Sequence, residues 1–105
     1  MPGPEQVVGV ELLTEFVASF AFIAAVVASK GNPIVAGIAL AIAIFLGGWM
    51  GDRANHVNPA ITIGLLVNGQ VGFARGASLI AMQVIGGILA VVAVALSKKM
   101  NFKKL

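Results

Sequence analysis

The chain has 105 residues, of which 59% are hydrophobic and 10% are charged, with one histidine and no cysteine. This composition excludes a soluble globular domain and leaves no material for a disulfide framework or a metal cluster, so neither a metal nor a cofactor is expected. The net charge of +3 does not indicate a nucleic-acid partner, because four lysines lie together after the last apolar segment, where lysines usually contact anionic lipid headgroups.

The first apolar segment, residues 7–29, is long enough to span a bilayer, and its only charged residues are Glu11 and Glu15. We expect Glu11 to lie in the membrane interface. Glu15 lies one turn deeper, where an unpaired carboxylate is costly, so it is expected to face protein rather than lipid. Such a carboxylate either braces a neighbouring loop or relays protons, and bracing is favoured because no second acid or histidine lies on a plausible proton path.

A second membrane-spanning helix is predicted over residues 33–50. It begins at Asn32-Pro33, which is a typical helix start because Asn is a good cap and Pro is favoured at the first helical position. The glycines and alanines of this segment favour close packing against other membrane helices. A polar and irregular segment, residues 51–57, follows it.

A short helix is predicted over residues 59–67. Asn58-Pro59 repeats the cap-plus-proline start, and Asn68-Gly69 is a typical stop. The pair alone would also fit an ordinary helix start. However, this helix is roughly 15 Å long at about 1.5 Å per residue, which is half of a hydrocarbon thickness of about 30 Å. A half-length apolar helix is tolerated at membrane depth only where its first turn lines a cavity, so we expect a re-entrant half-helix in a pore wall.

A third membrane-spanning helix is predicted over residues 73–96, and Gln83 is its only strongly polar interior residue. We expect Gln83 to form a hydrogen bond between this helix and the loop before the short helix. The predicted fold is therefore an all-α membrane protein with three transmembrane helices and one re-entrant half-helix, in a single domain over residues 1–105. Such a chain is a multi-pass integral membrane protein of a plasma or inner membrane.

The chemistry expected of this loop is the passage of a neutral polar solute. If the Asn58 oxygen accepts a backbone N–H of the first turn, its amide N–H groups remain as donors to a water or alcohol oxygen. The positive end of the short helix disfavours a cation at the same place. His56 either braces the loop or lines the pore. No nucleophile and base pair, metal cluster or phosphate loop indicates an enzyme.

An ordered set of motifs resembles a known family. The set is Thr14-Glu15-Phe16, then His56, then Asn58-Pro59-Ala60 with Ile61-Thr62, and then Met82-Gln83-Val84-Ile85-Gly86. It resembles the first half of the aquaporins, the major intrinsic protein family of water and glycerol channels, over about residues 11–96. The resemblance implies six spans in two inverted halves, each with a half-helix, and two Asn-Pro-Ala caps that meet at mid-membrane. It also implies four pores in a tetramer.

The sequence departs from the family pattern because the second half is missing. The selectivity arginine of the family follows the second Asn-Pro-Ala motif, whereas Ile61 stands after Ala60 here. The aromatic filter position of the second span corresponds to Ala36 or Ile38, and neither residue is aromatic. We therefore expect a filter that is wider and less polar than that of a strict water channel.

A single chain of this kind forms half of a pore wall. A second half-channel chain would complete the pore, either as an inverted copy of the same chain or as a different half, with a higher oligomer also open. The family topology would leave the four tail lysines outside the cell, against the positive-inside tendency, so the chain inserts the other way round, inserts both ways, or depends on a partner half for its orientation. The alternative function is a non-conducting structural or interaction protein, or a split fragment of a full-length channel.

Overall fold

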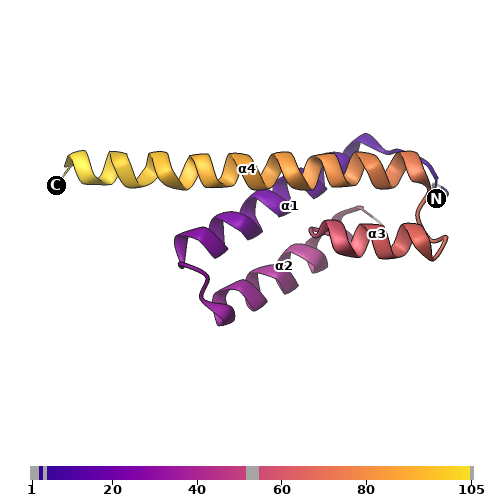
Figure 1. The fold of residues 1–105 in the computed structure, drawn as a ribbon, viewed down its shortest axis with the longest axis horizontal. Coiled ribbons are helices and arrows are strands. Elements are labelled where there is room, and N and C mark those ends of the chain that lie inside the picture. The colour runs from indigo at the N-terminus through magenta and orange to yellow at the C-terminus, as the bar shows by residue number, and fades with distance from the viewer. Residues whose placement is uncertain (1–2, 4, 52–54, 105) are drawn as a thin grey trace.

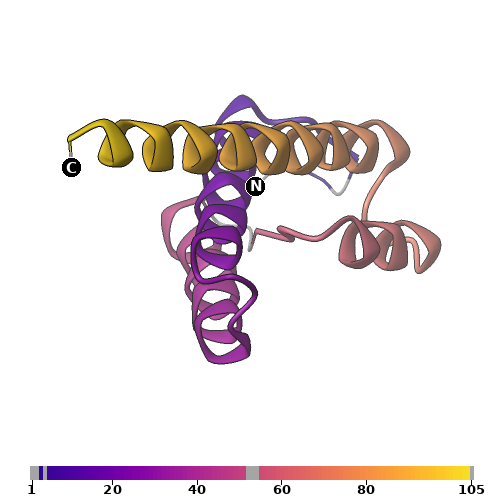
Figure 2. The same cartoon turned by 60° about the vertical axis from the view of Figure 1, so that its left-hand side comes forward.

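The computed structural model describes residues 3, 5–51 and 55–104, which form four helices and no strand. The helices are α1 (Gly9–Ala28), α2 (Pro33–Gly51), α3 (Pro59–Val67) and α4 (Phe73–Lys104). Helix α4 is a long rod that packs against α1 and α3, and α2 packs against α1 (Figure 1). The C-terminal part of α4 projects beyond the other helices in both views (Figure 2).

Helix α3 has the predicted bounds because both of its ends are specified locally. The Asn58 Oδ1 atom accepts a hydrogen bond from the Ala60 N–H at 2.8 Å, and Pro59 occupies the first helical position. At the other end Gly69 has a φ of +76°, which glycine adopts without a Cβ penalty. The N–H of Gln70 then donates to the Leu65 carbonyl at 2.9 Å, which completes a Schellman motif.

Helices α1 and α4 run in the same direction and approach closely. Glu11 contacts Arg75, Glu15 contacts Gln83 further along both helices, and Gly86 lies further still, against α1. A Cβ atom at Gly86 would lie 2.7 Å from a backbone oxygen of α1, so only glycine fits at this distance. The small residue therefore sets the separation of the two helices, as is common in membrane bundles.

Within the described residues, two helices are long and apolar enough to cross a membrane, namely Gly9–Ala28 and the Phe73–Met100 part of α4. In the most apolar stretch of each helix, only 22% is buried inside the protein. Most side chains of these two stretches therefore face outward, as expected for helices surrounded by lipid. The apolar part of α2, Pro33–Gly47, is shorter. That α2 spans the membrane, and that α3 is re-entrant, therefore stay predictions.

Helix α4 continues beyond the predicted end of the third membrane span. We expected the span to end near residue 96, where the basic tail begins, and the helix itself continues to Lys104. The physical reason is that the tail contains no glycine or proline, and its lysines and methionine are good helix formers that let the helix continue. The other boundaries differ from the predictions by one or two residues, which is within the usual fraying of helix ends.

Candidate functional site

The carboxylate of Glu15 holds the backbone of the loop that precedes α3. It accepts a hydrogen bond from the His56 N–H at 3.0 Å, and its second oxygen accepts one from the Val57 N–H. Val57 has a φ of +64°, a left-handed conformation that β-branched residues rarely adopt and that costs about 1–3 kcal/mol. Glu15 is only 1% exposed, so these bonds form away from solvent and compensate for the strained backbone.

A second set of hydrogen bonds joins α4 to α1 and α3, and it joins the loop to α3, so Gln83 reaches the loop only through Glu15 and Thr62. The Gln83 Nε2 atom donates to Glu15 at 3.1 Å and to the Thr62 hydroxyl at 2.8 Å. The same hydroxyl lies 2.8 Å from the His56 Nδ1 atom. Because the Thr62 oxygen already accepts from Gln83, its hydrogen is available to His56 Nδ1, which favours the histidine tautomer with the proton on Nε2. All four side chains are buried.

A buried ion pair lies further toward the start of α1 and α4. Arg75 Nε lies 3.0 Å and 3.1 Å from the two carboxylate oxygens of Glu11, and its Nη2 lies 2.6 Å from one of them. We expected Glu11 in the membrane interface and did not predict this pair. One signal was present in the sequence: Glu11 precedes Glu15 by one helical turn and Arg75 precedes Gln83 by about two, so both pairs lie on the same helix faces.

A half-open hollow of about 390 Å³ lies next to this loop. Its lining residues are Ile44, Asn55, His56, Ile61, Leu65, Gln70, Val71 and Arg75. Of the predicted pore residues, His56 and Ile61 are therefore brought together here. The Asn58-Pro59-Ala60 triplet lies between them in the chain at the start of α3, and Asn58 is exposed.

The two predicted filter residues lie elsewhere. Ala36 and Ile38 are near the start of α2, and neither lines this hollow or the hollow between α1 and α2. Ile38 is 57% exposed within the single chain. A role for these two side chains would thus require a surface contributed from outside the described part of the chain.

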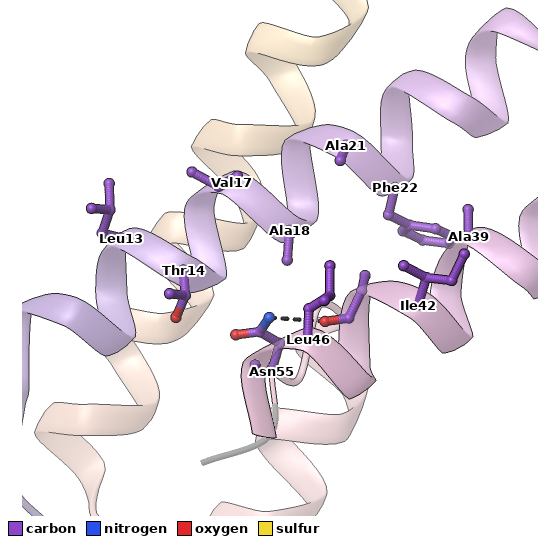
Figure 3. A pocket seen from close by; sticks show the side chains of 12 residues that line it. Leu13, Thr14, Val17, Ala18, Ala21, Phe22, Ala39, Ile42, Leu46 and Asn55 are labelled. Carbon is purple, nitrogen blue, oxygen red and sulfur yellow. Dashed lines mark hydrogen bonds between the residues drawn. The ribbon is translucent and has the colours of Figure 1, made fainter. Parts of the chain in front are cut away.

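A second hollow, of about 410 Å³, lies between α1 and α2 (Figure 3). It is almost entirely apolar, and the polar groups at its edge are already bonded within the chain. The Asn55 Nδ2 atom donates to the Ala43 carbonyl at 2.9 Å, as drawn in Figure 3, and the Thr14 hydroxyl donates to the Glu11 carbonyl at 3.0 Å. A Cβ atom at Gly47, within α2, would lie 2.4 Å from the backbone nitrogen of Asn55, so glycine is needed where Asn55 packs against α2.

Comparison with known proteins gives a consistent result. The model of the family described as "Major intrinsic protein" matches residues 5–104. The chain is 35% identical over 86 residues to the "Glycerol uptake facilitator protein-like 6" of Lactiplantibacillus plantarum, which covers 80% of this chain and 40% of that protein. It is 34% identical over 100 residues to the "Probable aquaporin TIP3-2" of Oryza sativa subsp. japonica, with 81% and 38% covered. No solved structure matches significantly. The chain spans about two fifths of the length of these relatives.

Proposed function

Because this chain belongs to the major intrinsic protein family, we propose that it is half of a membrane channel that passes water or a small neutral solute such as glycerol. The observation that carries the proposal is the loop before α3. A buried carboxylate, Glu15, holds two consecutive backbone N–H groups of this loop beside an open hollow and the capped start of a nine-residue helix. Family membership places the arrangement in an integral membrane protein.

The short helix fits a re-entrant position. Nine residues give a length of about 14 Å, less than half of the hydrocarbon thickness of about 30 Å. Irregular backbone at such a depth is stable only if its polar groups are bonded or line a cavity. Here the His56 and Val57 backbone donors of the loop are bonded to Glu15, and the hollow beside the loop supplies the cavity.

The same geometry suggests how a neutral solute would be recognised. Asn58 uses its oxygen to cap α3, which leaves its amide N–H groups to donate to an oxygen of water or an alcohol. His56, in the tautomer favoured by its contact with Thr62, offers Nε2–H to the hollow that it lines. The start of α3 carries a partial positive charge, which disfavours cations and hydrated protons.

The hollow is open on one side, so a pore requires a second wall. We propose that another half-length chain supplies it, in the simplest case a copy inverted about a two-fold axis in the membrane plane, with the two Asn58 caps facing each other at mid-membrane. In such a dimer Ile61 replaces the selectivity arginine on both walls, and Ala36 and Ile38 leave the filter wide, which favours glycerol-sized solutes.

The test is the osmotic response of vesicles that carry the purified chain. We expect rapid water or glycerol flow with a low activation energy. Asn58→Asp should lower permeability by about fivefold to tenfold, because it removes donors whose hydrogen bonds contribute about 1–1.5 kcal/mol. Asn32→Asp is the matched control: Asn32 caps α2 through its Oδ1 atom in the same Asn-Pro context, outside the hollow.

A non-conducting protein would give a different result in this experiment. The short length of the chain also fits a split fragment, or a non-conducting structural protein that only associates with other helices. Flow at the bare-lipid rate, from vesicles in which the chain is inserted and helical, would contradict the inverted copy. It would favour either a different partner half or the structural role.

A further inference from the structure

One end of the helix bundle carries exposed basic residues. Helices α1 and α4 run in the same direction, so Lys30, just after α1, lies at the same end of the bundle as Lys98 and Lys99 of α4. All three side chains are exposed. The four acidic residues of the whole chain are Glu5, Glu11, Glu15 and Asp52, and none follows position 52. No acidic residue of α4 can therefore neutralise these lysines.

The other end of the same helices differs. Arg75, near the start of α4, is 6% exposed and is paired with Glu11 at 2.6 Å. That cation is neutralised within the chain and withdrawn from the surface. The contrast indicates that the exposed lysines are directed at a partner outside the chain, whereas Arg75 serves the interior.

The structure adds the geometry of the lysines on α4. Ala90 is fully buried, residues 91–100 are half-buried or exposed, and α4 continues as a regular helix to Lys104. From Leu96 to Lys104 the helix advances by about 12 Å at about 1.5 Å per residue. A headgroup layer is about 5–8 Å thick on each side of the hydrocarbon. A helix that leaves the hydrocarbon near Leu96 thus carries its lysines through the headgroup layer.

The two exposed lysines of α4 do not share one direction. At about 100° per residue, Lys99 lies about 100° around the helix axis from Lys98. The helix dipole favours cations only in the last turn, and it does not account for Lys98 and Lys99, which lie earlier.

We propose that this basic end, made of Lys30, Lys98, Lys99, Lys103 and Lys104, binds the headgroups of anionic phospholipids. The lysines donate to lipid phosphates and fix the depth at which α4 leaves the hydrocarbon. Each lysine near an anionic surface strengthens the attraction by a factor of about five, and salt weakens it. The binding does not depend on conduction, because none of these residues lines the hollow beside α3.

The test uses the absence of cysteine from the sequence. A fluorophore is attached to the full chain through Ser97→Cys, next to the lysines, or through Val7→Cys at the opposite end of the bundle. The vesicles contain phosphatidylcholine with one fifth phosphatidylglycerol, and a small fraction of either lipid carries a quenching nitroxide. We expect labelled phosphatidylglycerol to quench the probe at position 97 about fivefold more than labelled phosphatidylcholine does. At position 7 the two lipids should quench equally.

Two variants separate lipid binding from folding. Lys→Gln at positions 98, 99, 103 and 104 should abolish the preference for phosphatidylglycerol, while Lys→Arg at the same positions should keep it. In the unaltered chain with the probe at position 97, the preference should disappear in 1 M salt, which provides a test even if the glutamine variant fails to insert. Equal quenching by both lipids, or a preference that survives both the glutamine variant and high salt, would overturn the proposal.

Discussion

Replacing Glu15 is the most informative single perturbation of the loop. Its carboxylate accepts hydrogen bonds from the His56 and Val57 backbones and from Gln83. Glu15→Gln keeps one acceptor oxygen but turns the other into an NH₂ donor, which would face a backbone N–H group in a buried site. A buried donor left unsatisfied costs about 1–3 kcal/mol, and the strain of about 1–3 kcal/mol at Val57 then lacks part of its compensation.

Measured hydrogen-bond energies in membrane proteins argue for a smaller loss of stability. Hydrogen bonds between their side chains contribute only about 0.6 kcal/mol on average, because the groups find other partners when the bond is removed. The backbone N–H groups of His56 and Val57 have few other acceptors within reach, since the Glu15 carboxylate that they contact is 1% exposed and lies away from solvent. We therefore expect Glu15→Gln to lower the free energy of unfolding by about 2–4 kcal/mol.

The assay combines global and local readouts. Unfolding in mixed micelles gives the change in free energy, and amide hydrogen exchange reports on His56 and Val57 individually. We expect both amides to exchange at least about tenfold faster in Glu15→Gln, which corresponds to about 1.4 kcal/mol of lost protection. Glu5→Gln, at an exposed position before α1, is the control. Unchanged exchange at both amides, with a stability change below about 0.5 kcal/mol, would refute the reasoning.

Three further predictions test other contacts. Arg75→Gln should destabilise the bundle by about 3–5 kcal/mol by removing the cation that pairs with the buried Glu11 carboxylate, and the double change with Glu11→Gln should recover part of this loss in thermal unfolding. Gly86→Leu should separate α1 from α4 and abolish a disulfide cross-link between cysteines introduced on the facing sides of these two helices, whereas Gly37→Ala, where a Cβ meets open space, should be neutral or slightly stabilising. Thr62→Val should cost about 1–3 kcal/mol in the same unfolding assay by leaving its two partners without a hydroxyl, and an unchanged midpoint would contradict the network.

The sequence allowed α3 to be predicted because its signals are local. Asn58 and Pro59 specify the start, and Asn68 and Gly69 specify the stop, within a few residues of the helix ends. The continuation of α4 beyond residue 96 was not predicted, for the opposite reason. Nothing in its tail breaks a helix, and a change from apolar to basic residues marks a change of surroundings rather than of backbone conformation.

The contacts of the site were less predictable. The Glu11–Arg75 pair joins residues 64 positions apart, and it depends on the parallel packing of α1 and α4 that only the fold specifies. Glu15 and Gln83 were easier, because a polar residue within an apolar membrane helix must find a partner. The positions of Ala36 and Ile38 relative to a pore remain predictions, since apolar side chains carry no directional chemistry from which a neighbour could be inferred.

The attachments of the loop before α3 imply an order of assembly. Asn55 is bonded to α2, and His56 and Val57 are bonded to α1, so this part of the loop can settle once the first two helices are inserted. The hydrogen bond between Thr62 and Gln83 forms later, because Gln83 belongs to α4, which is synthesised after α3. During synthesis α3 is therefore left without its final neighbour until α4 is inserted, and slowing that insertion should prolong the exposure of α3 to quality-control proteases.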